Sequence, residues 1–289
     1  MSMSPRWHLI VDFDGTITQS DTIAELVRSA IQRHPTATRP RLASAWHDAQ
    51  TRYLAALSAH SAKYRPSEPQ RTTPAHEEAF LADLKPIEEA SLSRVSHSGI
   101  FDALPPRILH EMGAEAVLEG RIALRPGWDR LLVRAAAADV PLTVLSVHWS
   151  RSFIQGVLSR GAPPLEVVAN EIAEGGRIVG PGSASARLTT AADKMAEMRR
   201  RAVAADVVYL GDSPTDLTCL LGARRGVVLV PGGEPASPLL DSLRRIGVGV
   251  AHVGEMASWA ATTCAETEEK VVFWARDMDE VLRSGVLGI

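Results

Sequence analysis

Cysteine is scarce in this sequence, and its scarcity argues against two kinds of protein. The 289 residues include two cysteines, Cys219 and Cys264, whereas a secreted disulfide scaffold carries more of them in a shorter chain. Neither cysteine lies in a CxxC pair or beside a histidine, so we expect no zinc site built on thiolates. The pattern predicts two reduced, buried thiols in a reducing compartment.

The sequence also lacks a membrane-length apolar run near its start and an excess of charge of one sign. The first apolar run, residues 8–13, contains Asp12 and is followed at once by Asp14. It is too short for a membrane span and does not resemble a signal peptide. The net charge of −3 is unlike that of a general nucleic-acid binder. We therefore expect a soluble, cytoplasmic protein with neither a membrane nor a nucleic acid as partner.

The composition is that of an ordinary globular protein. Hydrophobic residues make up 45% of the chain and charged residues 22%, which is close to the average of soluble proteins. A chain of this length can bury a substantial core, in one large domain or two modest ones. Disorder throughout the chain is not expected.

Short apolar runs rich in β-forming residues predict a buried parallel sheet. The clearest runs are residues 8–13, 141–145, 206–210 and 226–230, and shorter strands are expected at 167–169, 177–179 and 270–274. Helical patterns lie between or after them, at residues 127–138, 191–204 and 277–284. Strands that alternate with helices predict an α/β fold, with a Rossmann-like parallel sheet between two layers of helices.

The segment from residue 17 to residue 125 has a different pattern. It contains no convincing buried strand, and its apolar spacing predicts helices at residues 22–32, 41–62, 75–95 and 99–118. A segment of this length is not a loop. We predict an all-helical cap, residues 17–125, inserted into a core made of residues 1–16 and 126–289. The alternative is that these helices simply pack on the sheet.

Two pairs of carboxylates follow predicted strands. Asp12 and Asp14 close the first strand, and carboxylates this close are unfavourable unless a cation or a proton lies between them. Asp212 and Asp216 follow the strand at 206–210, four residues apart, so a helical turn places both on one side. Oxygen ligands in this arrangement suit a hard cation. Each pair could instead cap a turn or a helix.

Two further polar residues come at the ends or starts of elements. Ser146 follows the strand at 141–145, where its hydroxyl could donate to a phosphate oxygen or cap a helix. Lys194 lies near the start of the helix at 191–204, where a lysine could hold a phosphate near the helix N-terminus. The alternative for Lys194 is an ordinary surface lysine.

The order and spacing of these residues resemble the four motifs of the haloacid dehalogenase superfamily of aspartate-nucleophile phosphatases. Residues 12–16 (DFDGT) resemble the first motif, Ser146 the second, Lys194 the third and residues 211–216 the fourth. The resemblance extends from Ile10 to about Val230. The helical insertion after the first motif resembles the type 1 cap of the phosphoserine phosphatase-like branch, as do residues 12–18 followed by Asp21 and residues 170–172.

The resemblance implies a mechanism in which Asp12 attacks phosphorus and becomes an aspartyl phosphate. Asp14 would protonate the leaving oxygen and then activate the water that cleaves the intermediate. A Mg²⁺ ion would be held by Asp12, Asp212 and the main-chain carbonyl of Asp14. Asp216 would be either a water-mediated metal ligand or an anchor for Lys194.

The resemblance also implies which residues contact the substrate. Ser146, Lys194 and Thr16 would hold the phosphate oxygens, and the presence of Asp14 favours ester hydrolysis over dehalogenation. Asp21, His148 and Trp149 are possible substrate contacts. Asp21 is equally explained as a helix cap and Trp149 as a core residue. Phosphoserine phosphatases carry a glutamate where this chain has Asp21, so phosphoserine itself is not the expected substrate.

The predicted function is therefore a Mg²⁺-dependent phosphomonoester hydrolase that acts on a small phosphorylated metabolite. A phosphotransferase or mutase on the same scaffold, and a non-catalytic regulatory protein that keeps the fold, are the alternatives. Between residues 28 and 71 there are eight Lys and Arg, three His and two Asp and Glu. This stretch could attract an anionic substrate, or it could be a solvated basic face.

Overall fold

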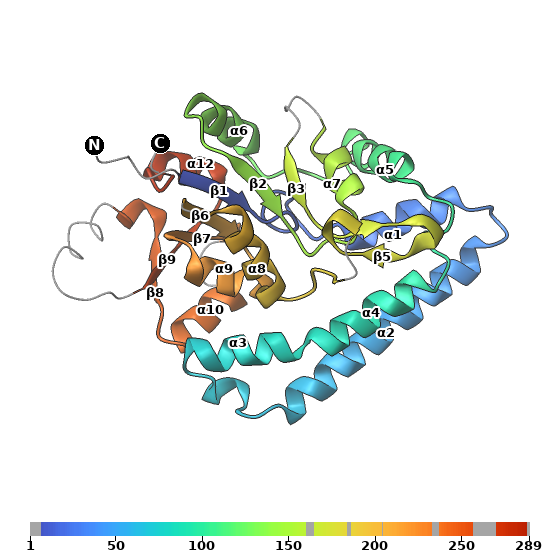
Figure 1. The fold of residues 1–289 in the computed structure, drawn as a ribbon, viewed down its shortest axis with the longest axis horizontal. Helices are drawn as coiled ribbons and strands as arrows, with labels where there is room; N and C mark the ends of the chain where they lie inside the picture. Colours follow the sequence, from blue (N-terminus) through green and yellow to red (C-terminus); the bar gives the residue numbers. More distant parts are fainter. Residues whose placement is uncertain are drawn as a thin grey trace.

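A seven-stranded parallel sheet forms the centre of the computed structural model, which describes residues 7–159, 165–183, 186–203, 205–232, 237–256 and 270–287. The strand order is β3-β2-β1-β6-β7-β9-β8, and every neighbouring pair is parallel (Figure 1). The strands are β1 (Trp7–Val11), β2 (Leu142–Leu145), β3 (Glu166–Val168), β6 (Asp206–Gly211), β7 (Arg225–Leu229), β8 (Gly249–His252) and β9 (Val271–Ala275). The predicted Rossmann-like parallel sheet is confirmed.

The apolar runs located these strands to within about two residues, with one exception. Strand β8 was not predicted, because its sequence, GVAH, follows a glycine-containing stretch and is not a continuous apolar run. Its pairing with β9 at the edge of the sheet stabilises it. The short strand expected at 177–179 pairs instead in a separate two-stranded antiparallel sheet of β4 (Glu171–Ile172) and β5 (Ile178–Val179).

Helices cover both faces of the sheet, because side chains alternate along each buried strand. Leu9 and Val11 of β1 belong to the hydrophobic cluster of one face, and Ile10 belongs to that of the other. The first cluster includes residues of α6 (Trp128–Ala137), α7 (Arg151–Val157) and α12 (Met278–Ser284). The second includes residues of α8 (Ala191–Arg201), α9 (Leu217–Gly222) and α10 (Pro238–Arg245). None of the described helices is long and apolar enough to cross a membrane.

The inserted segment is helical, as predicted, but two of its helices differ from the prediction. It consists of α1 (Ile23–Arg33), α2 (Arg39–Lys63), α3 (Pro74–Asp83), α4 (Lys85–Ser96) and α5 (Pro106–Leu118). The single helix predicted at 75–95 is wrong, because Pro86 in the first turn of α4 lacks the N–H that would continue α3. The helix predicted from residue 99 begins only at Pro106, since consecutive prolines at 105 and 106 suit a helix start and not its interior.

The inserted helices pack directly on the rest of the chain. Helices α2 and α4 run side by side along one edge of the molecule, while α5 lies against α7 (Figure 1). Gly113 of α5 and Gly156 of α7 allow this approach, because a Cβ atom at either position would clash with the backbone of the other helix. Residues of α1, α2, α4 and α5 share one hydrophobic cluster with strand β1. The division into a core and a separate cap at residues 16 and 126 remains a prediction.

A buried cluster of charges attaches the far end of the insertion to α10. The Glu77 carboxylate of α3 accepts hydrogen bonds from Arg71 Nε at 2.8 Å and from Arg245 Nη1 at 3.0 Å. Arg245 Nη1 also donates to the carbonyls of Arg71 at 2.6 Å and Glu68 at 2.9 Å. The Arg71 guanidinium lies 3.9 Å from the centroid of the Phe80 ring. The side chains of Arg71 and Glu77 are only 5% and 6% exposed, so solvent screens this cluster weakly.

A second contact joins the start of α4 to the start of α8. Lys85 Nζ lies 2.7 Å from a carboxylate oxygen of Asp193, and the Arg187 guanidinium pairs with Glu89. Asp193 also belongs to the capping box that begins α8. The insertion is therefore tied to the same helix that carries Lys194.

The buried cluster makes a prediction about stability. Glu77→Ala would leave the guanidinium groups of Arg71 and Arg245 without their shared carboxylate. We expect a loss of about 3–5 kcal/mol in the free energy of unfolding, because an unpaired buried charge is unfavourable. Urea denaturation followed by circular dichroism measures it.

Asp48→Ala provides the matched control for Glu77→Ala. Asp48 pairs with Arg52 on the surface, where the two side chains are 57% and 65% exposed. This change should alter the free energy of unfolding by no more than about 0.5–1 kcal/mol. Equal effects of the two substitutions would contradict an anchoring role for the buried cluster.

Candidate active site

The candidate site lies where the strand order of the sheet reverses. From β1 the chain adds β2 and β3 on one side, and β6 then begins the other side. Ligands of open α/β sheets bind in the crevice at the carboxyl ends of the strands at such a point. Asp12 directly follows β1 and donates its backbone N–H to the Leu210 carbonyl at 2.9 Å, while Asp212 directly follows β6. The topology therefore brings together two carboxylates that are 200 positions apart in the sequence.

Lys194 is fully buried between two carboxylates. Thr190 and Asp193 form a capping box that fixes the start of α8 and places Lys194 in its first turns. Its Nζ donates to Asp12 Oδ1 at 2.7 Å and to Asp216 Oδ1 at 2.5 Å. Burial alone would lower the pKa of Lys194, but the two carboxylates together raise it, so the lysine is charged. Its 0% exposure excludes an ordinary surface lysine.

Asp216 combines two of the three roles considered for it, those of cap and of anchor for Lys194; the third was that of a water-mediated metal ligand. Its Oδ1 accepts hydrogen bonds from Lys194 and, at 2.6 Å, from the Tyr209 hydroxyl. Its Oδ2 accepts from the backbone N–H groups of Asp212 at 3.1 Å and Ser213 at 3.0 Å. Both oxygens are thus engaged with protein donors, and Asp216 orients Lys194. Tyr209 was missed because a tyrosine within an apolar strand gives no signal beyond core packing.

Asp14 is positioned by the segment that leads into α1. Its Oδ1 accepts hydrogen bonds from the backbone N–H of Thr22 at 2.9 Å and from the Thr22 hydroxyl at 2.6 Å. Burial raises the pKa of Asp14 to about 7, and the negative charge of Asp21 adds to this effect. Asp21 is exposed, and its Oδ1 accepts from the backbone N–H of Ile23 at 2.9 Å; the N-cap of α1 is the next residue, Thr22.

The turn after Asp14 is fixed by a buried arginine that sequence analysis did not identify. Arg125 Nε donates to the Thr16 carbonyl at 2.8 Å, and its guanidinium also contacts the Gly15 carbonyl. Gly15 has φ +70°, and a Cβ atom there would clash with the Asp212 carboxylate. The Thr16 hydroxyl donates to Asp212 Oδ1 at 3.0 Å. The only sequence signal for Arg125 was a charged residue at the boundary where the insertion rejoins the core.

Ser146 and the loop after it form another part of the site. The Ser146 backbone N–H donates to the Val168 carbonyl at 2.9 Å, and its hydroxyl oxygen accepts from the His148 N–H at 3.1 Å. The hydroxyl thus closes a tight turn and does not cap α7, whose N-cap is Ser150. Asn170, another residue without an assigned role in the sequence analysis, donates to the Val147 carbonyl at 3.1 Å and holds this loop in place.

His148 is buried and neutral. Its ring packs between those of Phe13 and Phe153, with centroid distances of 5.7 and 5.5 Å. Burial lowers its pKa to about 3, so the ring is uncharged at neutral pH. Nδ1 lies 3.1 Å from the Ser150 backbone nitrogen and 3.2 Å from the Ser150 carbonyl oxygen. Nε2 is buried and has no hydrogen-bond partner within the described part of the chain.

A pocket of about 250 Å³ brings most of the predicted site residues together. The predicted residues on its lining are Asp12, Asp14, Asp21, Ser146, His148, Trp149 and Asp212. The remaining three, Thr16, Lys194 and Asp216, do not line it and are fully buried. Each of these three hydrogen-bonds to Asp12 or Asp212, so they support the lining carboxylates from behind.

The carboxylates that line this pocket, together with Asp216 behind it, could bind a hard cation. One carboxylate oxygen each from Asp12, Asp212 and Asp216 lies within 4.8 Å of the others. Burial, followed by the charge of Asp216, raises the pKa of Asp12 well above its ordinary value and that of Asp212 to about 7. Three carboxylates thus lie close together beside the single positive charge of Lys194, and oxygen donors of this kind suit Mg²⁺. Since both oxygens of Asp216 are engaged, Asp12 and Asp212 are the better ligands.

Comparison with known proteins decides the family. Residues 9–221 match the model of the haloacid dehalogenase-like hydrolases. The chain belongs to this family. The resemblance to this family, drawn from the motifs, is confirmed.

Three individual proteins show how similar this haloacid dehalogenase-like hydrolase is to known sequences and structures. A CTO1 family protein of Schizosaccharomyces pombe is 32% identical over 233 residues, which cover 73% of this chain and 77% of the relative. A substrate-bound phosphoserine phosphatase has a TM-score of 0.50 at 15% identity, covering 98% of this chain and 99% of its own. Cytosolic 5′-nucleotidase IIIB bound to cytidine has a TM-score of 0.53 at 15% identity, covering 98% and 84%. These two structures show that the fold is shared.

Because the pKa of Asp212 is raised, we predict that the stability of the folded protein depends on pH when no metal is bound. The folded pKa is about 7 and the ordinary value about 3.9, so the folded state binds this proton more tightly. Stability therefore falls as pH rises from about 4 to about 7. Asp212→Asn removes the charge and keeps an acceptor for Thr16. In EDTA at pH 8, its melting temperature should exceed that of the wild type.

The same melts at pH 5 should show a smaller difference between the two proteins, and Asp48→Asn should change neither value. A wild type that melts higher than Asp212→Asn in EDTA at pH 8 would show that the Asp212 charge is already compensated.

Proposed function

We propose that the chain is a Mg²⁺-dependent phosphomonoester hydrolase that acts on a small phosphorylated metabolite through an aspartyl phosphate. The observation that carries this proposal is the position of Asp12 on the pocket lining, with Oδ1 held by Lys194 and Asp14 on the same lining. A nucleophile and an adjacent proton donor are what transfer of a phosphoryl group to a carboxylate requires. Membership of a hydrolase family and a fold shared with phosphatases support it.

In the first step, a carboxylate oxygen of Asp12 forms a bond to phosphorus while the bond from phosphorus to the ester oxygen breaks. Asp14 gives its proton to that leaving oxygen. A pKa of about 7 leaves a large fraction of Asp14 protonated at neutral pH. In the second step, ionised Asp14 takes a proton from water, which attacks phosphorus and releases phosphate from Asp12.

A phosphoryl oxygen would be held by the Ser146 hydroxyl, while Lys194, buried behind Asp12, would contribute positive charge. The Thr16 hydroxyl already donates to Asp212, so we assign Thr16 to supporting that carboxylate. Asp216 keeps Lys194 in place. His148 and Trp149 border the pocket from the loop after β2.

The cation would be held by Asp12, Asp212 and the main-chain carbonyl of Asp14. When bound, it would supply positive charge to the phosphoryl oxygens and keep Asp12 ionised. The phosphatase assignment accounts for Asp14, since a halide leaving group needs no proton. A phosphotransferase would use the same residues and differ in the group that accepts phosphate. The intact set of Asp12, Asp14, Lys194 and Asp212 argues against a non-catalytic role.

A cytoplasmic location is part of the proposal. Cys219 is buried, and the presence of only two cysteines in the chain supports a reducing compartment. The other cysteine, Cys264, lies outside the described residues.

The proposal predicts that p-nitrophenyl phosphate is hydrolysed with Mg²⁺ and that excess EDTA abolishes this activity. Asp12→Asn keeps the size of the side chain but removes the nucleophile, so turnover should fall to background while the melting temperature shows a folded protein. Asp48→Asn is the surface control and should retain full activity. Turnover of the Asp12→Asn variant above a few per cent of wild type, or activity in EDTA, would refute the proposed nucleophile or the metal requirement.

The role of Asp14 predicts a dependence on the leaving group. Asp14→Asn should slow alkyl phosphates by about 10²–10⁴-fold and p-nitrophenyl phosphate much less, because nitrophenolate leaves without a proton. In the wild type, kcat for an alkyl phosphate should fall above pH 7 as Asp14 loses its proton. Steady-state kinetics on both esters measures the difference. Equal losses on the two esters would remove Asp14 from the role of acid.

A further inference from the structure

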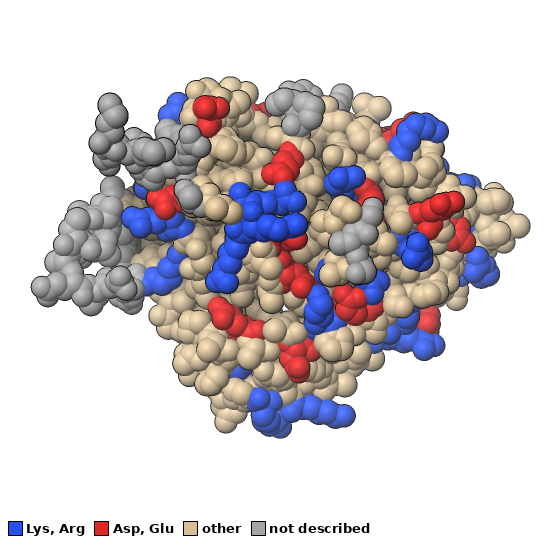
Figure 2. All heavy atoms as spheres, viewed as in Figure 1, with Lys and Arg blue, Asp and Glu red and all other residues tan. Residues whose placement is uncertain are grey.

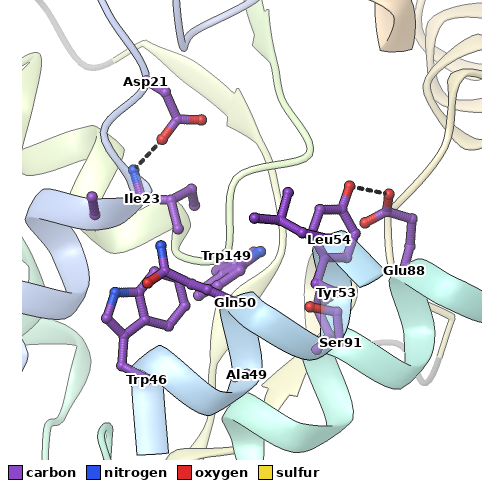
Figure 3. A pocket seen from close by; sticks show the side chains of 12 residues that line it. Asp21, Ile23, Trp46, Ala49, Gln50, Tyr53, Leu54, Glu88, Ser91 and Trp149 are labelled. Carbon is purple, nitrogen blue, oxygen red and sulfur yellow. Dashed lines mark hydrogen bonds between the residues drawn. The ribbon is translucent and has the colours of Figure 1, made fainter. Parts of the chain in front are cut away.

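A second pocket leads from the catalytic pocket into the inserted helices. Its volume is about 370 Å³, and it lies between α1, α2, α4 and the loop that carries Trp149 (Figure 3). Asp21, Ile23 and Trp149 line both pockets, so the two pockets adjoin. A phosphoryl group held at Asp12 would therefore have the rest of its molecule directed towards this second pocket.

Aromatic rings form much of its wall. The Trp46 and Trp149 rings meet edge to face at a centroid distance of 5.9 Å, one from the insertion and one from the core. The Tyr53 hydroxyl donates to Glu88 Oε1 at 2.8 Å (Figure 3). Leu54, although 62% exposed, also lines the pocket. Such walls favour a ligand with an apolar or planar body.

The charge of the two pockets is of one sign. Among the described residues, the carboxylates of Asp21 and Glu88 line the second pocket, and neither pocket is lined by a lysine or an arginine. The basic residues between 28 and 71, all of which the structure describes, lie elsewhere. Arg33 pairs with Glu115, for example, and Arg71 with Glu77. On the face seen in Figure 2, acidic and basic side chains are interspersed. A second anionic group on the substrate would thus find no cationic partner here.

Building on the proposed phosphatase function, we propose that the second pocket binds the leaving alcohol of the substrate, and that this alcohol carries a positively charged amine on an apolar or aromatic body. Ammonium groups are attracted to the faces of tryptophan and tyrosine rings. Glu88 adds a carboxylate at a part of the second pocket that the catalytic pocket does not share. The phosphate and the amine would therefore be bound at different ends of the combined cavity.

Among the residues of the second pocket, Glu88 is the main reason to expect a positively charged group on the ligand. Its Oε1 is held by the Tyr53 hydroxyl, and burial raises its pKa. A partly buried carboxylate with a neutral partner gains stability from an added positive charge. Glu88 thus distinguishes an amine from a hydroxyl or a carboxylate at the same position of a ligand.

Three phosphate esters that share one ring provide the test. Pyridoxamine phosphate, pyridoxine phosphate and pyridoxic acid phosphate carry an amine, a hydroxyl and a carboxylate at the same ring position. We expect kcat/KM to fall in that order, with about a tenfold preference for the amine over the hydroxyl. Glu88→Gln, which keeps an acceptor for Tyr53, should reduce this preference to near unity. Glu78→Gln, an exposed glutamate outside both pockets, should leave the preference unchanged.

Binding measured without turnover separates this inference from the proposed function. Isothermal titration of the Asp12→Asn variant with the three esters should give the same order of affinities. If p-nitrophenyl phosphate is hydrolysed but kcat/KM is equal for the three esters, the inference about the second pocket is overturned and the proposed phosphatase function stands. Absent hydrolysis with tightest binding of the amine would overturn the phosphatase and support the pocket assignment. A preference that survives in Glu88→Gln would also overturn the role of Glu88.

Discussion

The rest of the site depends on the pairing of Lys194 with Asp12 and Asp216. A lysine with no exposed surface is unfavourable unless carboxylates surround it, and a buried carboxylate such as Asp12 is unfavourable without a cation. Each charge is therefore the condition for burying the other. The distances of 2.7 and 2.5 Å require the ends of β1 and β6 and the start of α8 to meet at one point. The strand reversal between β1 and β6 supplies that meeting place.

The cluster of Lys194, Asp12 and Asp216 also explains why a further positive charge would stabilise the site. Lys194 serves two carboxylates, while Asp212 receives a hydroxyl hydrogen bond from Thr16 and no direct ion pair within the described residues. Arg125 lies close by, but its guanidinium is engaged with the backbone carbonyls of the turn at residues 15–18. Burial, followed by the negative charge of Asp216, raises the pKa values of Asp12 and Asp212. A divalent cation and a substrate amine would satisfy two different parts of one acidic cavity.

Sequence reasoning located what is encoded locally and missed what depends on tertiary contacts. The strands were found from apolar runs, and the motif residues were found because each follows a strand or opens a helix at a recognisable spacing. The partners that position them, Thr22 for Asp14 and Tyr209 for Asp216, could not be predicted, since their neighbours in sequence give no sign of the contact. The pocket formed by α1, α2 and α4 was missed for the same reason. Of the two alternatives for the basic stretch at 28–71, the pocket linings favour a solvated basic face, because none of its Lys or Arg residues lines either pocket.

The attachment of the insertion limits how the site can open. The inserted segment is joined to the core beside the nucleophile, where Thr18 bridges Leu124, and it is fixed again at its far end by Glu77 and Arg245. A rigid rotation about the first attachment would have to separate the second, and leaving a buried charge unpaired costs about 3–5 kcal/mol. The contact between Lys85 and Asp193 would be lost as well. Movement that admits a substrate is therefore less costly in the segments that border the two pockets than in the insertion as a whole. Under the proposed function, substrate selection would then rest on the shape and charge of a largely preformed cavity. In such a cavity, carboxylates and aromatic rings can discriminate between ligands of similar size.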